Sequence, residues 1–137
     1  MRSSKPILLV EDDDVDQMVM ERAFKDLKIA NQLVKMANGE ETLEFLKTEN
    51  NKKPCIILLD LNMPKMNGIE FLKILKADEA LKKIPVVVMT TSRAEQDIVK
   101  SFRLGAAGYI VKSIDYKKSV ETIMAIDLCL SSSELSD

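Results

Sequence analysis

The chain has 137 residues, of which 46% are hydrophobic and 31% are charged, and its formal net charge is −2. These values predict one folded domain over residues 1–137, with a core at about 5–130 and a polar tail at 131–137. The small acidic excess argues against nucleic-acid and anionic-membrane partners, because both need a basic surface. The chain has no histidine, which excludes a Ser-His-Asp triad and a His-ligated zinc site.

The cysteines and the apolar runs indicate a cytoplasmic protein. Cys55 and Cys129 are too few for a zinc site or a disulfide framework, and both lie among apolar residues. We therefore expect two buried thiols in a reducing compartment. No apolar run approaches the roughly 18 residues of a membrane span. The N-terminal apolar stretch is too short for a signal peptide.

Short apolar runs alternate with amphipathic stretches along the chain. In chain order, they predict a strand at 7–10, a helix at 15–27, a weaker strand at 32–37, a helix at 38–48, a strand at 55–59, a helix around 69–75, a strand at 84–89, a helix at 92–104, a strand at 108–111 and a helix at 115–130.

Capping signals refine two of these helices. Asn38 and Glu41 have the spacing of a capping box at the start of one helix, and Ser92 and Glu95 have the same spacing at the start of another. Gly105 would end the second helix in the C′ position.

The predicted elements form five successive strand–helix units. Three of the strands are unbroken runs of β-branched residues or leucine, which is typical of strands covered on both faces of a parallel sheet. Right-handed crossovers then give a doubly wound α/β sandwich. In such sheets the chemistry lies beyond the carboxyl ends of the strands, near the topological switch point.

Polar residues follow four of the predicted strands. The first strand is followed by the acidic run 11–14, and the third by Asp60. The fourth is followed by the hydroxyl residues 90–92, and the fifth by Lys112. If these strands are neighbours, one pocket holds several carboxylates, a hydroxyl and an ammonium.

Electrostatics predict what such a pocket binds. Two carboxylates about 5 Å apart repel by about 3 kcal/mol at an effective dielectric of about 20. Lys112 alone supplies too little positive charge, so a divalent cation with oxygen ligands is expected, and Mg²⁺ fits best. Mg²⁺ and Lys112 would then neutralise phosphoryl oxygens, while Thr90 donates a hydrogen bond. Asp60, at the centre, is the expected nucleophile.

Each of these residues also has a purely structural interpretation. Asp13, Asp14 and Asp16 are explained as charges that complement a helix dipole. A single Asp after a strand is often a turn former, a Thr there is often a cap, and a Lys is often solvated. Their occurrence together at one edge of one sheet is what favours a functional site.

Four segments carry a resemblance to a known family: LLVEDD at 8–13, LLDLNMPKMNG at 58–68, VVVMTTS at 86–92 and GAAGYIVK at 105–112. Together they resemble the response-regulator receiver domain, the CheY-like module of two-component signalling. The resemblance covers about residues 5–130. It implies a flavodoxin-like three-layer sandwich whose five parallel strands have the order 2-1-3-4-5.

The resemblance also implies a metal and phosphoryl site. Asp60 matches the phosphoacceptor, and Thr90 and Lys112 match the groups that bind the phosphoryl oxygens. Glu11 and Asp12 match the acidic pair, with Asp12 the direct Mg²⁺ ligand and Glu11 acting through water. An Asp12–Asp13 register is an alternative. The remaining metal ligands would be Asp60 itself and the backbone carbonyl of Asn62, and Mn²⁺ would substitute for Mg²⁺.

Further residues match positions that transmit or time the signal. Thr90 and Tyr109 match the switch pair, in which the aromatic ring turns inward as the hydroxyl moves toward the phosphate. Asn62 and Thr91 flank the site and would tune the phosphoryl lifetime.

The implied function is that of a single-domain response regulator rather than an enzyme. A partner phosphohistidine, on a sensor histidine kinase or a histidine phosphotransfer protein, would supply the phosphoryl group. The signal would leave through the surface formed by 92–104, 108–111 and 115–130, toward a downstream protein or a second copy of the chain. Four apolar residues of this region fit either the core or an exposed dimer face: Ile98, Phe102, Ile123 and Met124.

One residue departs from the family pattern. Ser113 follows Lys112, where the family usually has a proline, often after a cis peptide bond. We expect either a trans bond with a different loop or a cis bond held by strain. The combination of MTTS with KS resembles a subgroup that includes partners of bacterial phytochrome kinases.

Two other functions remain open at this point. A Mg²⁺-dependent phosphatase of the haloacid-dehalogenase type also uses an Asp nucleophile, but it needs a second carboxylate at the position of Asn62 and usually a cap domain. A receiver-like interaction module that takes no phosphate is the other alternative, although such a module would be expected to lack Asp60, the acidic pair or Lys112.

Overall fold

The computed structural model describes residues 5–48, 53–63 and 65–131, except for the side chains of 129–131. The expected burial of Cys129 and the predicted tail beyond residue 131 lie outside this part of the chain. Cys55 is buried, as predicted.

Five parallel strands form one sheet in the order β2-β1-β3-β4-β5, which confirms the predicted fold. The strands are β1 (Ile7–Val10), β2 (Leu33–Met36), β3 (Ile56–Leu59), β4 (Val86–Thr90) and β5 (Gly108–Val111). The helices are α1 (Asp14–Asp26), α2 (Gly39–Lys47), α3 (Gly68–Ala77), α4 (Glu95–Arg103) and α5 (Tyr116–Ser131). None of the described helices is long and apolar enough to cross a membrane.

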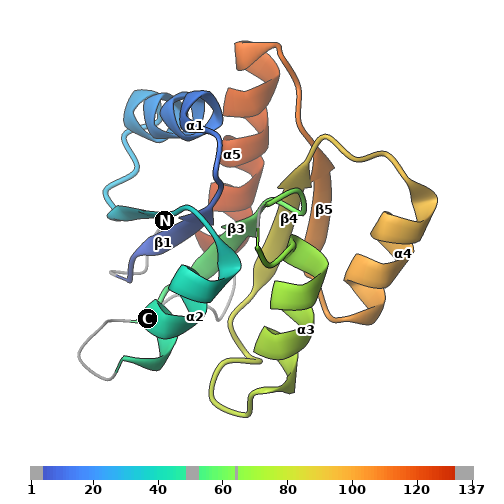
Figure 1. The fold of residues 1–137 in the computed structure, drawn as a ribbon. Helices are drawn as coiled ribbons and strands as arrows, with labels where there is room; N and C mark the ends of the chain where they lie inside the picture. The colour runs from blue at the N-terminus through green and yellow to red at the C-terminus, as the bar shows by residue number, and fades with distance from the viewer. Residues whose placement is uncertain (1–4, 49–52, 64, 132–137) are drawn as a thin grey trace.

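The helices cover both faces of the sheet (Figure 1). Successive strand residues point to opposite faces, so each strand contributes to two cores. Leu8, Ile57 and Val88 lie in the core under α2 and α3. Leu9 and Leu58 lie in the core under α1 and α5. Burial on both faces explains why β1, β3 and β4 are unbroken apolar runs.

Asn38 and Ser92 were both predicted to cap helices, and only the first does. Asn38 accepts a hydrogen bond from the backbone N–H of Glu41 at 2.9 Å and caps α2. The prediction for Ser92 is wrong, because α4 begins at Glu95 with Ala94 at its N-cap and no side-chain cap. The Ser92 hydroxyl donates to Asp97 Oδ2 at 2.6 Å instead. Gly105 follows α4 with a φ of 101°, as its predicted C′ position requires.

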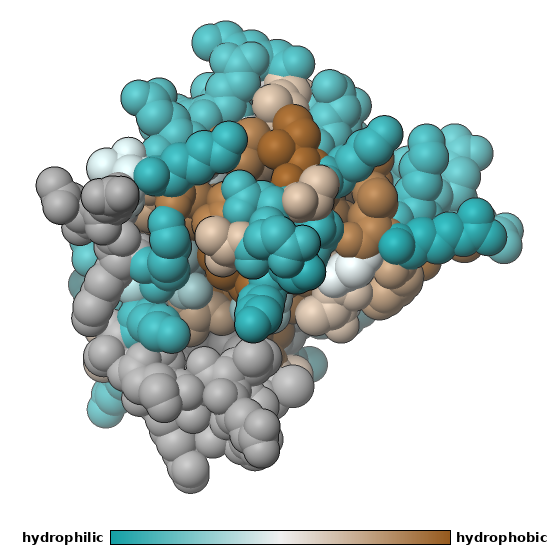
Figure 2. Space-filling view, turned by 90° about the horizontal axis from the view of Figure 1, so that it is seen from below, coloured by the Kyte–Doolittle hydropathy of each residue, from teal (hydrophilic) through white to brown (hydrophobic). Residues whose placement is uncertain are grey.

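Several large apolar side chains remain at the surface. Viewed from below, the molecule shows apolar side chains in the middle of this face, among charged and polar ones (Figure 2). The structure also separates the four residues that fitted either core or surface. Ile123 is fully buried and Ile98 partly buried, whereas Phe102 and Met124 are exposed.

Gly68, the first residue of α3, packs against the backbone that follows β3. A Cβ at this position would lie 2.6 Å from the carbonyl oxygen of Asp60 and 2.6 Å from the Cα of Leu61. The Gly68 N–H also donates to the Leu61 carbonyl at 2.9 Å. A Cβ at this position would therefore clash with backbone atoms, which cannot move aside as the end of a flexible side chain could.

We predict that Gly68→Ala lowers the free energy of unfolding by about 2 kcal/mol, because the overpacking outweighs the better helix propensity of Ala. Gly108→Ala is the matched control, since a Cβ there meets only Val87 side-chain atoms at 3.6 Å. Its effect should stay below about 1 kcal/mol. Urea unfolding followed by circular dichroism measures both, and equal losses would contradict the explanation.

Candidate functional site

The parallel register brings the ends of four strands to one edge of the sheet. Val10 of β1 lies opposite Leu59 of β3, so the next residues, Glu11 and Asp60, lie side by side. Thr90 of β4 lies opposite Val111 of β5, and the Lys112 N–H donates to the Thr90 carbonyl at 2.8 Å. The site predicted from the strand ends is thus assembled by backbone pairing alone.

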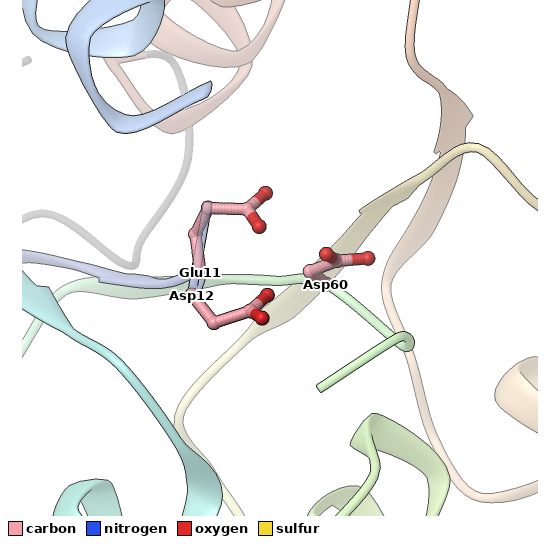
Figure 3. A group of neighbouring side chains, drawn as sticks. All are labelled: Glu11, Asp12 and Asp60. Atoms are coloured by element: carbon pink, nitrogen blue, oxygen red, sulfur yellow. The ribbon is translucent and has the colours of Figure 1, made fainter. Parts of the chain in front are cut away.

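Three carboxylates form an acidic cluster at this edge (Figure 3). One oxygen from each of Glu11, Asp12 and Asp60 lies within 4.8 Å of the others. Glu11 and Asp60 are buried, whereas Asp12 is exposed. Clustered carboxylate oxygens beside solvent suit a hard divalent cation, which these three residues would hold. Such a cation supplies positive charge that offsets the repulsion between them.

Lys112 is the cation that the chain itself supplies. Its ammonium makes ion pairs with Glu11, with Asp16 Oδ2 at 2.7 Å and with Asp60 Oδ2 at 3.4 Å. All described peptide bonds are trans, so the bond to Ser113 is trans. Of the two arrangements that the missing proline left open, the structure has the trans one, and it leaves Lys112 in contact with Asp60.

Burial and neighbouring charges raise two pKa values in the site, so both groups hold a proton more strongly than usual. Burial is the largest influence on Glu11 and raises its pKa to about 7, helped by the neighbouring Asp60 and opposed by the hydrogen bond from Lys112. Burial lowers the pKa of Lys112, but hydrogen bonds to Asp16 and Glu11 outweigh it and raise that pKa above its ordinary value. The lysine therefore stays charged while Glu11 binds a proton readily near neutral pH.

Asn62 is hydrogen-bonded both to Asp60 and to Thr90. The Asn62 N–H donates to Asp60 Oδ1 at 3.2 Å, and the Asn62 side-chain amide donates to Thr90 Oγ1 at 3.3 Å. Thr90 is fully buried, whereas Asn62 and Thr91 are exposed. The use of the Asn62 carbonyl as a ligand, and of Asn62 and Thr91 to set a lifetime, stay predictions.

Tyr109 connects β5 to the loop before α4. Its ring is partly buried against the core, and its hydroxyl donates to the Ser92 carbonyl at 3.0 Å. The Ser92 N–H in turn donates to Thr90 Oγ1 at 3.4 Å. The structure thus connects Thr90 to Tyr109 through the backbone of Ser92.

Asp13 and Asp16 illustrate what the sequence did and did not reveal. Asp13 caps α1 by accepting from the N–H groups of Val15 at 2.8 Å and Asp16 at 3.0 Å. Its carboxylate is therefore engaged, which favours Glu11–Asp12 over Asp12–Asp13 as the metal-binding pair. Asp16, interpreted from sequence as a dipole charge, also binds Lys112, and no local pattern in the sequence indicates this pair.

Residues 7–124 match the family described as the response regulator receiver domain. The chain belongs to this family. It is therefore a receiver-domain protein of two-component signalling, as the four sequence segments indicated.

The relatives include phytochrome response regulators. The chain is 38% identical to response regulator Rcp1 of Synechocystis sp. over 127 residues, which is 90% of this chain and 86% of that protein. It superposes on the crystal structure of the Mn²⁺-bound form of Rcp1 with a TM-score of 0.87 and 36% identity, over 97% of this chain and 99% of the other. The phosphorylated cyanobacterial phytochrome response regulator RcpA gives a TM-score of 0.87 and 35% identity, over 95% and 96%.

The pKa of Glu11 predicts how cation binding depends on pH. Below about pH 7 Glu11 is protonated, so a cation must displace a proton from it. We expect the dissociation constant for Mn²⁺ to be about tenfold higher at pH 6 than at pH 8. The electron paramagnetic resonance signal of free Mn²⁺ measures this constant directly.

Glu11→Gln is the control, because Gln has no proton to lose in this range. Its Mn²⁺ affinity should be weaker but should change by less than about threefold between the two pH values. A tenfold dependence that persists in this variant would assign the proton to another group.

Proposed function

We propose that this protein is a phosphorylation switch in which Asp60 accepts a phosphoryl group from a phosphohistidine. The observation that carries the proposal is the position of Asp60, buried in the acidic cluster and in contact with Lys112. The chain has no histidine, so the donor is another protein. A sensor histidine kinase or a histidine phosphotransfer protein supplies that group.

The transfer is a substitution at phosphorus. A carboxylate oxygen of Asp60 forms the new O–P bond, the P–N bond of the donor breaks, and its electron pair stays on the imidazole nitrogen. Glu11, Asp12, Asp60 and the Asn62 carbonyl would hold Mg²⁺, which would supply positive charge to the phosphoryl oxygens when bound. Lys112 and Thr90 donate hydrogen bonds to the same oxygens.

Exposed apolar residues on both sides of the site support a protein donor. Val15 and Met18 are exposed on α1, which begins directly after the acidic run. Ile114 is fully exposed two residues after Lys112. Apolar surface around an otherwise polar site is typical of a protein-binding face. Since similar structures include phytochrome and bacteriophytochrome response regulators, we propose a phytochrome kinase as the donor.

The signal leaves through α4, β5 and α5. When Thr90 turns its hydroxyl to the phosphoryl group, it no longer accepts from the Asn62 amide or the Ser92 N–H. The Ser92 carbonyl accepts a hydrogen bond from the Tyr109 hydroxyl. When Ser92 moves, this hydrogen bond breaks, and the released ring of Tyr109 turns inward. The altered surface binds a downstream protein or a second copy of the chain. The protein acts as a switch in the cytoplasm and turns over no separate substrate.

Intact-mass spectrometry after incubation with acetyl phosphate tests the proposal. We expect one added phosphoryl group in the presence of Mg²⁺ and none with EDTA, because the transferring group needs the cation's charge. Asp60→Asn should carry no adduct. Full labelling of this variant would contradict the assignment of Asp60.

The same samples distinguish the two alternatives. Sustained hydrolysis of p-nitrophenyl phosphate over many turnovers would indicate a phosphatase, which the amide of Asn62 at the acid–base position argues against. The absence of both an adduct and bound beryllofluoride would indicate an interaction module that takes no phosphate.

The link between Tyr109 and Ser92 predicts a change in local dynamics. Tyr109→Phe removes the hydroxyl that donates to the Ser92 carbonyl, so amide hydrogen exchange in residues 91–95 should become about fivefold faster, as expected for one hydrogen bond. Tyr116→Phe is the control, because the Tyr116 hydroxyl binds Asp26 elsewhere. Equal exchange at 91–95 in both variants would show that Tyr109 does not restrain this loop.

A further inference from the structure

Asp16 binds the lysine of the site without belonging to the acidic cluster. Its Oδ2 atom lies 2.7 Å from Lys112 Nζ, closer than Asp60 Oδ2 at 3.4 Å. The cluster that would hold a cation contains Glu11, Asp12 and Asp60 but not Asp16. Asp16 belongs to the first turn of α1, so a helix rather than a strand end positions it.

The contacts of Lys112 leave it no hydrogen for another acceptor. An ammonium has three N–H donors, and three carboxylates, Glu11, Asp16 and Asp60, accept from it. A phosphoryl oxygen on Asp60 can therefore receive a hydrogen bond from Lys112 only when one of these contacts is given up.

Burial indicates that Asp16 is the contact given up. The side chains of Glu11 and Asp60 are 3% and 7% exposed, whereas that of Asp16 is 40% exposed. Water can solvate Asp16 when the ammonium leaves, but it cannot reach Glu11 in the same way. A cavity of about 480 Å³, lined by Asp16, Asp60 and Lys112, gives the lysine side chain room to move.

We propose that Asp16 is a positioning residue that shares the Lys112 ammonium with Glu11 and Asp60 in the unphosphorylated protein and releases it when the phosphoryl group arrives. Asp16 thereby competes with the phosphoryl group for Lys112 and weakens the binding of that group. This inference rests on the proposed function of Asp60 and adds a residue that makes the switch easier to reverse.

Beryllofluoride, which resembles a phosphoryl group bound to a carboxylate, tests the competition. At saturating Mg²⁺, Asp16→Asn should bind beryllofluoride about threefold more tightly than the wild type, the size expected for loss of a partly exposed ion pair. Fluorine NMR measures the bound fraction. Damage to the fold would weaken binding, so a gain in affinity separates this role from a structural one.

Asp14→Asn is the matched control, because it removes the same charge from the same helical turn. Asp14 is exposed, and the carboxylates that pair with Lys112 among the described residues are Glu11, Asp16 and Asp60. The beryllofluoride affinity of this control should stay within about 1.5-fold of the wild type. Asp16→Glu keeps the charge and should return the affinity toward the wild-type value.

Mn²⁺ binding without beryllofluoride gives a second, independent comparison. In Asp16→Asn the ammonium is left with Glu11 and Asp60 and competes with the cation for them, so Mn²⁺ should bind more weakly than in Asp14→Asn. An unchanged or weaker beryllofluoride affinity in Asp16→Asn, or equal gains in both variants, would overturn the inference. A wild type that binds Mn²⁺ but no beryllofluoride would contradict the proposed function instead, and the Mn²⁺ comparison alone would then decide whether Asp16 holds Lys112.

Discussion

A single ammonium group, that of Lys112, lies among the carboxylates that gather at one edge of the parallel sheet. Lys112 pairs with Glu11, Asp16 and Asp60 at once, and two of these three are nearly inaccessible to water. Buried carboxylates repel each other strongly and cost free energy unless a positive charge lies among them. The site therefore keeps an excess of negative charge, which a divalent cation would offset.

The fold creates this excess of negative charge through backbone pairing. The registers of β1 with β3 and of β4 with β5 place the acidic run beside Asp60 and Lys112 beside Thr90. The same elements connect the site to the surface, since Thr90 ends β4 and Tyr109 lies in β5. A change of charge at Asp60 would thus act on residues that are already hydrogen-bonded to the loop before α4.

Much of the fold and of the site could be predicted from sequence, because the positions of the strands determine both. An unbroken apolar run marks a strand buried on both faces, and the residue after it must lie at the sheet edge. The start of α4 could not be predicted. The Ser92 hydroxyl binds the Asp97 carboxylate and does not cap the helix, and the spacing of Ser92 and Glu95 in the sequence does not distinguish these two arrangements. The ion pair of Asp16 with Lys112 joins residues 96 positions apart, and no local pattern encodes it.

A crystal structure of the protein with Mg²⁺ and beryllofluoride would test the account most directly. We predict that Lys112 Nζ lies within hydrogen-bond distance of a fluorine atom on Asp60 and no longer contacts Asp16, with Thr90 Oγ1 turned toward the same group. A lysine that remains 2.7 Å from Asp16 beside a fully bound beryllofluoride would contradict the central claim, that one ammonium changes partners as the switch operates.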